Sequence, residues 1–174
     1  MASWRPMTEH DISGVMRVAE EVHRSLPEQE STFRERLSLF PDGCMVLIRE
    51  EEKDDQMLPM VGGYLISFPI RHGRPPALDQ PLGETPPDSN QYYIHDLAIL
   101  PAFRRGGAGT QCIHRVLDSP VVRKYLTTCL ISVYGTAPFW VRFGFVRPEP
   151  PTDVAMIEKL CSYGPDAVYL LRRN

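Results

Sequence analysis

The chain has 174 residues, a length that fits one ordinary domain. Hydrophobic residues make up 43% and charged residues 24%, a balance that excludes a wholly disordered chain, a coiled coil and a collagen-like fibre. The net charge of −3 argues against a general nucleic-acid binder, because such proteins are usually basic. We therefore expect one domain over residues 1–174 with no nucleic-acid partner.

The apolar segments are too short for a membrane helix, since none approaches the roughly 18–20 residues that a bilayer needs. The opening segment MASWRPMTEHD becomes charged almost at once and has no apolar signal-peptide core. The cysteines form no CxxC pair and lie in or beside apolar segments; they are Cys44, Cys112, Cys129 and Cys161. This predicts free thiols, no metal site and a reducing compartment. We expect a cytoplasmic protein without a membrane partner, with the nucleus as an open alternative.

The first half of the chain predicts a strand, two helices and an antiparallel hairpin. Thr8 is a good N-cap, and Asp11 follows it at the spacing of a capping box. The expected elements are a strand over 4–7, helices over 12–22 and from Ser31, strands over 44–49 and 60–68, and a solvated turn over 50–55. Two glycines in the segment MVGGYLISF indicate a bulge or a close backbone approach.

Residues 71–90 form the one break in composition, because they are rich in proline and polar residues. We expect an irregular loop inserted into the domain. So long a loop is either a disordered insertion or a lid on the substrate side.

The second half predicts an alternation of strands and helices. The expected elements are strands over 92–99, 129–133 and 167–172 and from Phe145, a helix after the turn at 104–109, a short helix from Pro138 closed by Gly144, and a helix over 153–160. The strand–helix–strand unit over 92–133 should be parallel and right-handed. The order predicts an α/β domain with a mixed sheet of six to seven strands and flanking helices.

The glycine-rich turn RRGGAG, residues 104–109, lies between a predicted strand and a predicted helix. Free backbone N–H groups and the dipole at a helix N-terminus attract anions, and glycines let the backbone approach a phosphate closely. Arg104 and Arg105 add charge. The turn matches neither a nucleotide P-loop nor a dinucleotide fingerprint. By itself it predicts either an anion site or a flexible basic turn.

The spacing Arg104-x-x-Gly107-x-Gly109 resembles the Q/R-x-x-G-x-G/A acetyl-CoA motif of the GNAT superfamily of N-acetyltransferases. The segment APFWVRFGF, residues 137–145, resembles that family's xPFYxRFGF segment after the fifth strand. The order of elements fits over the whole chain. Within the superfamily, the arylalkylamine N-acetyltransferase-like branch is the most similar.

The resemblance implies a sheet that splays between the fourth and fifth strands, with acetyl-CoA in the opening. The pantetheine arm would pair with the backbone of Leu97, Ala98 and Ile99. The pyrophosphate would lie on the amides of Arg105, Gly106, Gly107, Ala108, Gly109 and Thr110, and Arg104 would add a charge-assisted contact. Trp140 would pack against the cofactor or the substrate.

His95 is the candidate general base, because a neutral imidazole can take the proton of an ammonium group directly or through water. Its place matches one strand-four histidine of the arylalkylamine branch, while Tyr93 occupies the other. The alternative is a structural histidine. Strand alternation puts Asp96 on the opposite face unless the strand is bulged. No other histidine shows a partner in the sequence.

The acid position departs from the family, because Trp140 stands where the family usually has a tyrosine. An indole N–H donates a hydrogen bond but supplies no proton near neutral pH. Tyr134, at the end of the fifth strand, is the candidate acid. The alternative is that the CoA thiolate leaves without one.

We expect an acetyl-CoA-dependent N-acetyltransferase that works by direct attack in a ternary complex. The expected acceptor is a small arylalkylamine or polyamine, and the enzyme a monomer or a homodimer. The first alternative is a protein lysine or N-terminal acetyltransferase. The alternative of another class is a non-catalytic acyl-CoA-binding regulator.

Overall fold

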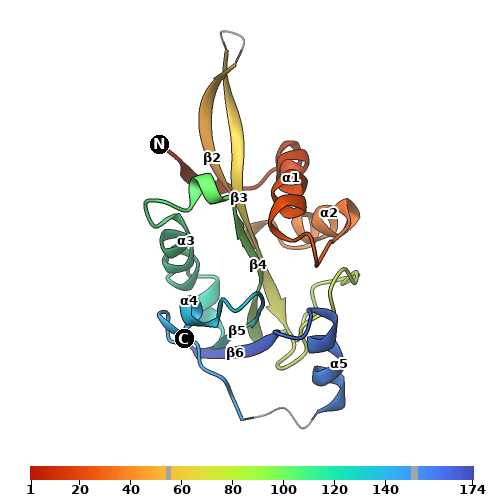
Figure 1. Cartoon of the computed structure of the whole chain (residues 1–174). Helices are drawn as coiled ribbons and strands as arrows, with labels where there is room; N and C mark the ends of the chain where they lie inside the picture. The colour runs from red at the N-terminus through yellow and green to blue at the C-terminus, as the bar shows by residue number, and fades with distance from the viewer. Residues whose placement is uncertain (54–55, 150–152) are drawn as a thin grey trace.

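The computed structural model describes residues 1–53, 56–149 and 153–174. A six-stranded mixed sheet in the order β1-β2-β3-β4-β5-β6 forms its centre (Figure 1). The strands are β1 (Ser3–Pro6), β2 (Cys44–Lys53), β3 (Gln56–Ile70), β4 (Gln91–Ile99), β5 (Thr127–Ser132) and β6 (Val168–Arg173). The helices are α1 (Ile12–Val22), α2 (Glu30–Leu39), α3 (Ala108–Leu117), α4 (Ala137–Val141) and α5 (Val154–Ser162). The expected mixed α/β fold is confirmed.

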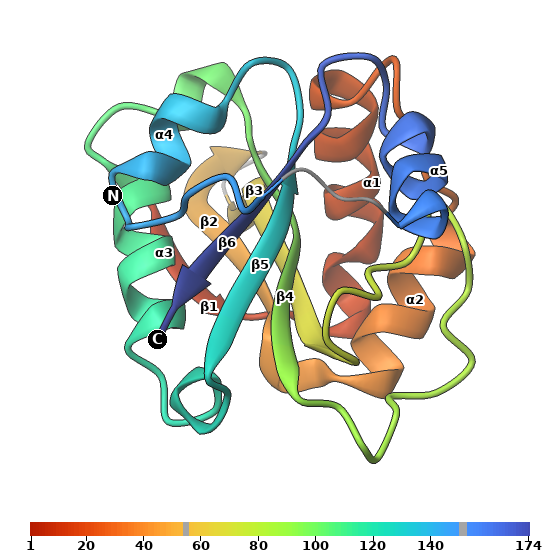
Figure 2. The same ribbon diagram turned by 90° about the horizontal axis from the view of Figure 1, so that it is seen from below.

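The helices cover both faces of the sheet. Figure 2 shows α1, α2 and α5 on one face and α3 and α4 on the other. Helix α1 buries Ile12, Val15 and Val18 completely, since they recur at helical spacing and face the sheet. The Asp11 carboxylate accepts hydrogen bonds from the backbone N–H and the hydroxyl of Thr8, as the capping pattern predicts.

The sheet opens between β4 and β5. All neighbouring strands are antiparallel except these two, which are parallel and joined through α3. Their pairing covers only Tyr92–Ile94 against Thr128–Leu130. From His95 onward, the described part of β5 no longer pairs with β4. The predicted splay is therefore confirmed.

Two β-bulges shape this region. In β3, Leu47 pairs with Gly63 and Ile48 with Val61, so Gly62 is an extra residue. A Cβ at Gly62 would lie 2.2 Å from the Phe103 ring, so the glycines serve both a bulge and a close approach. The second bulge is in β4, where His95 is the extra residue between Ile94 and Asp96.

Two predicted elements differ in the structure. The charged segment Glu50–Lys53 continues β2 rather than turning, and it pairs with the start of β3 in a two-stranded arm that extends beyond the rest of the sheet (Figure 1). Asp54 and Asp55 lie outside the described residues. The strand predicted from Phe145 is wrong: Val146 makes one isolated bridge to Leu171, and Pro148, which has no N–H, follows soon after.

Candidate active site

A cavity of about 800 Å³ occupies the opening between β4 and β5. Its wall includes nine of the residues predicted from the sequence: His95, Leu97, Ile99, Arg104, Gly107, Gly109, Thr110, Tyr134 and Trp140. The other predicted residues lie beside the lining rather than in it; they are Ala98, Arg105, Gly106 and Ala108. The cavity thus joins the glycine turn to the two predicted catalytic residues.

The glycine turn has the geometry of an anion site. Gly106 and Gly107 have φ angles of +85° and +74°, which other residues rarely adopt. Gly107 is the N-cap of α3, so the first helical N–H groups, over 108–110, have no acceptor inside the helix. No atom lies within 4 Å of a Cβ placed at Gly106 or Gly107. The space in front of the turn is open, and these residues fit a phosphate group.

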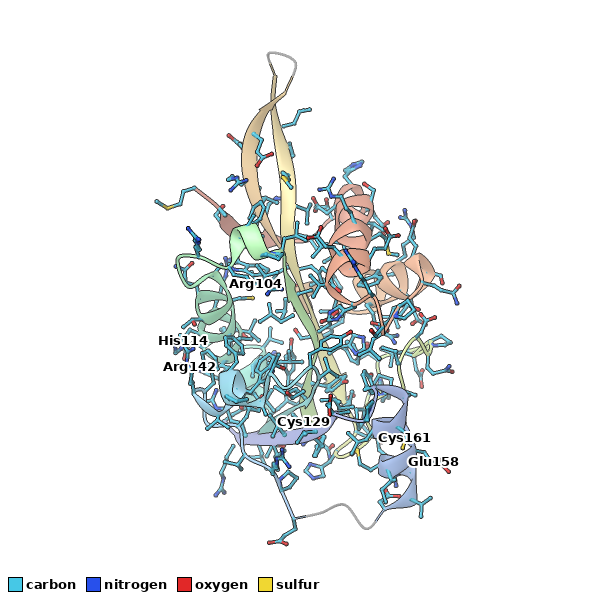
Figure 3. The ribbon with its side chains drawn as sticks, in the orientation of Figure 1. Arg104, His114, Cys129, Arg142, Glu158 and Cys161 are labelled. Atoms are coloured by element: carbon cyan, nitrogen blue, oxygen red, sulfur yellow. The ribbon has the colours of Figure 1, made fainter. Side chains whose placement is uncertain are left out.

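Two arginines stand at this end of the cavity. Arg104 Nε donates to the carbonyl of Ile99 at 2.9 Å and so ties the turn to the end of β4. Arg142 Nη2 lies 3.3 Å from Thr110 Oγ1. Figure 3 shows both arginines on the α3–α4 side of the molecule. Arg142 was not predicted as a site residue, although it belongs to the APFWVRFGF segment that carries the family resemblance.

The unpaired length of β4 gives the cavity a strand edge. Such an edge presents backbone N–H and C=O groups that need partners. A chain containing amide groups can pair with it as an added strand. Because Leu97 and Ile99 lie on this length, it fits the pantetheine arm of CoA.

His95 is almost completely buried at the opposite end of the cavity. Its side chain is 2% exposed, and Nε2 lies 2.9 Å from Glu28 Oε1. Nδ1 is buried and has no hydrogen-bond partner among the described residues. The rings of Tyr93 and Tyr163 surround the imidazole.

The β4 bulge brings Asp96 to the same end of the cavity, which corrects the simple alternation. Asp96 Oδ1 lies 2.9 Å from His23 Nε2, and Tyr64 donates its hydroxyl to Oδ2 at 2.5 Å. His23 therefore has a partner, contrary to the sequence-based prediction. Burial raises the pKa of Asp96, but His23 and the Tyr64 hydrogen bond outweigh it and lower this pKa overall.

Tyr134 lies two residues after the end of β5 and stacks on His23, with ring centroids 5.7 Å apart. It has a φ of +54°, which is uncommon for a residue other than glycine. Burial first, and Asp96 second, raise the pKa of Tyr134. Trp140 is buried and packs edge-on against Phe139 and Phe145.

The loop over 71–90 forms one side of the cavity at the end that holds His95 and Asp96. It contains no helix or strand, and Leu78 lines the cavity. Asp79 accepts hydrogen bonds from the Gln29 backbone and the Thr32 hydroxyl, and Tyr163 donates to the Pro76 carbonyl. The loop is thus fixed to the α1–α2 connection, α2 and the end of α5.

Sequence reasoning missed His23, Glu28 and Leu78. The first two lie between α1 and α2, where no motif marks them, and Leu78 lies in the irregular loop. Only tertiary packing brings them to the cavity.

The described residues contain no helix with the length and apolar content that crossing a membrane requires. They also contain no group of three or more His, Cys, Asp or Glu side chains placed to hold a metal ion.

The model of a family described as "Acetyltransferase (GNAT) family" matches residues 12–145. No curated protein matches the chain. A similar solved structure is the loading GNATL domain of CurA from Lyngbya majuscula, with 12% identity, a TM-score of 0.72 and coverage of 99% of this chain and 98% of that one. A chain of the NatC complex bound to Gag peptide and CoA has 15% identity, a TM-score of 0.68 and coverage of 99% and 98%. Rv2747 from Mycobacterium tuberculosis, in a complex with CoA, has 15% identity, a TM-score of 0.64 and coverage of 99% of each chain. Identities this low show a shared fold.

Proposed function

Because the chain belongs to the GNAT family of acetyltransferases, we propose that it transfers the acetyl group of acetyl-CoA to a small primary amine. The acceptor is an arylalkylamine or a polyamine. The observation that carries the proposal is one cavity that joins the α3 N-terminus to two histidine–carboxylate pairs, His95–Glu28 and His23–Asp96.

The shape and charge of the acceptor end support a small cationic amine. The volume of about 800 Å³ falls in the range of small-molecule sites. Glu28 and Asp96 place two carboxyl groups there, while Leu26, Leu78 and Tyr163 supply apolar and aromatic surface. The loop over 71–90 closes one side, which suits a compact acceptor better than a long peptide.

At the cofactor end, both backbone groups and side chains would bind acetyl-CoA. Arg104, Arg142 and the α3 N-terminus would hold the phosphates, and the free edge of β4 the pantetheine arm. When bound, acetyl-CoA supplies an activated acetyl thioester. Tyr134 keeps its proton at Oη, because its pKa is raised, and is therefore a donor toward the cavity.

We propose direct transfer without an acyl-enzyme. No cysteine is among the described residues that line the cavity. Burial raises the pKa of Cys44 and Cys129 to about 12, so these thiols stay protonated and unreactive near neutral pH. The acceptor amine itself is then the nucleophile, and its proton must pass to a base. His95, predicted from the sequence, and His23 are the two candidates.

Turnover with labelled acetyl-CoA against a panel of acceptors tests the proposal. The panel contains arylalkylamines, polyamines, lysine-containing peptides with blocked N-termini and peptides with free N-termini. We expect the highest kcat/KM with a small amine. A peptide as the best acceptor would favour the protein acetyltransferase, and tight acetyl-CoA binding without any turnover would favour the regulator.

A further inference from the structure

We infer that His23, rather than His95, takes the proton from the acceptor amine, with Asp96 holding the imidazole in the tautomer that this requires. The inference rests on the proposed transfer to an amine. It assigns a catalytic role to a residue in the connection after α1, outside both sequence motifs of the chain.

The hydrogen bonds of Asp96 fix the tautomer of His23. Tyr64 donates its hydroxyl to Oδ2, and His23 Nε2 lies 2.9 Å from Oδ1. An ionised carboxylate only accepts hydrogen bonds, and the lowered pKa of Asp96 keeps it ionised near neutral pH. Nε2 therefore carries the hydrogen of neutral His23, and the lone pair that can accept a proton is on Nδ1.

His23 is open to the cavity where that lone pair is needed. Its side chain is 13% exposed and lines the cavity, and its ring stacks on Tyr134 at the end of β5. Among the described residues, Nδ1 makes no hydrogen bond. Base and candidate acid thus lie side by side on the cavity wall.

His95 shares the first property, because the carboxyl group of Glu28 lies at its Nε2, but it lacks the second. Its side chain is only 2% exposed, and Nε2 is already occupied by Glu28. A proton added at Nδ1 would create a buried N–H without an acceptor, which disfavours protonation there. We therefore assign His95 the role of positioning Glu28 at the edge of the cavity.

The proton transfer balances in charge and atoms. The ammonium N–H bond breaks, its electron pair stays on the amine nitrogen, and the proton forms a new bond to Nδ1. The imidazolium that results keeps its Nε2–H bond to Asp96. Neutral amine and charged His23 are then present together, and the amine is free to attack.

The groups around His23 set the pH at which it accepts a proton. Asp96 faces it from β4 with Tyr64 behind, Glu28 from the connection before α2, and Tyr134 from the end of β5. Burial lowers the pKa of His23, but Asp96 and Glu28 outweigh burial and raise it above 6.5. The fraction of neutral His23 therefore increases as the pH rises through this raised pKa, and kcat/KM for the amine should increase in the same pH range.

The first test is nitrogen-15 NMR of the histidines in the enzyme without acetyl-CoA, with His23→Gln to assign the signal. We expect the Nε2–H tautomer and a pKa above 6.5. Asp96→Asn should lower that pKa, whereas Tyr64→Phe removes only a donor to the carboxylate and should not lower it. An Nδ1–H tautomer, or a pKa at or below 6.5, would overturn the inference.

The second test compares pH profiles of kcat/KM for one good amine in the wild type, His23→Gln and His95→Gln. We expect His23→Gln to lose about 10²–10⁴-fold in kcat/KM and the acidic limb of the profile, with the Kd of acetyl-CoA unchanged. His95→Gln should keep the limb. His10→Gln, at an exposed position, is the control and should match the wild type.

The outcomes separate the two claims. An acidic limb that survives in His23→Gln but disappears in His95→Gln would return the base to His95 and leave the proposed function intact. No turnover of any amine by the wild type would overturn the proposed function itself.

Discussion

The two ends of the cavity are built in different ways. At the proposed cofactor end, one continuous segment over 104–110 supplies the turn, the free helix amides and Arg104, and Arg142 joins it from the end of α4. At the acceptor end, the side chains come from the α1–α2 connection, β4, the loop over 71–90 and the end of α5. The cofactor end depends on local backbone geometry, and the acceptor end depends on tertiary packing. Substitutions should therefore have separable effects, with cofactor binding changed at one end and turnover or acceptor binding at the other.

The largest effect on acetyl-CoA binding should come from Gly109→Val, at the cofactor end. The branched side chain would fill space beside the helix amides that a phosphate needs. We expect acetyl-CoA affinity to fall by about a hundredfold or more, the value of two lost hydrogen bonds to a charged group. Calorimetry measures the Kd of acetyl-CoA for this variant and for the wild type.

Gly109→Ala is the matched control. A Cβ there would make ordinary contacts of 3.5 Å with Ile99 and Phe139, so binding should stay near the wild-type value. Equal affinity of the valine variant and the wild type would refute the cofactor site.

Tyr134→Phe, at a residue of the cavity wall, should give the next largest effect. Loss of the hydroxyl removes a hydrogen bond to developing negative charge, so kcat should fall by about tenfold or more. The KM for acetyl-CoA should change little. Steady-state kinetics should compare kcat and the KM for acetyl-CoA in the wild type, in Tyr134→Phe and in Trp140→Tyr. The last variant restores the residue that is usual in the family. A strong gain from the tryptophan variant together with no loss from Tyr134→Phe would reverse the two roles.

Arg104→Ala should weaken acetyl-CoA binding by about tenfold, less than Gly109→Val, because it removes one charge-assisted contact and leaves the helix amides. It also removes the hydrogen bond to the Ile99 carbonyl. Calorimetry in low and high salt measures the charge contribution. Unchanged affinity in low salt would exclude Arg104 from phosphate binding.

The smallest effect should come from Asp79→Ala, which releases the 71–90 loop from Gln29 and Thr32. We expect the KM for the amine to rise about twofold to fivefold, and the KM for acetyl-CoA to stay constant. Faster amide exchange in the loop would show the release. Equal changes in both KM values would contradict the separation of the two ends.

The contact of Asp79 with Gln29 and Thr32 should depend on pH, because the carboxyl group of Asp79 can be protonated. Burial raises the pKa of Asp79, but the hydrogen bonds from Thr32 and Gln29 outweigh it and lower this pKa below 3.8. The stabilisation is therefore present above that value and is lost as the pH falls through the folded-state pKa. Amide exchange in the loop should accelerate only in that acidic range.

The turn and helix start over 104–110 could be predicted from the sequence because their geometry is set locally. Gly107 must adopt a positive φ wherever this turn occurs, and a helix start leaves N–H groups free in any protein. The spacing of such residues can be read directly. The splay of β4 and β5 followed from the family resemblance rather than from the residues alone.

The acceptor end could not be read in the same way. The bulge at His95 arises from the pairing of β4 with β3, where the register shifts between Ile66 and Ser67. No residue type in β4 predicts this bulge. His23 and Glu28 need the packing of α1 and α2 before they meet β4. The strand expected from Phe145 failed for a different reason, since apolar residues there find only one bridging partner.

The bulge in β4 means that the number of residues in this strand decides which side chains reach the cavity. With an even alternation, His95 and Asp96 would face opposite sides of the sheet, and only one histidine–carboxylate pair could form at the cavity. One inserted residue lets two consecutive positions contribute to the same site. A relative that keeps the His-Asp pair but lacks the insertion would therefore lose one pair with no change of residue type. The number of residues in β4 therefore decides which side chains reach the cavity, as much as the types of those residues do.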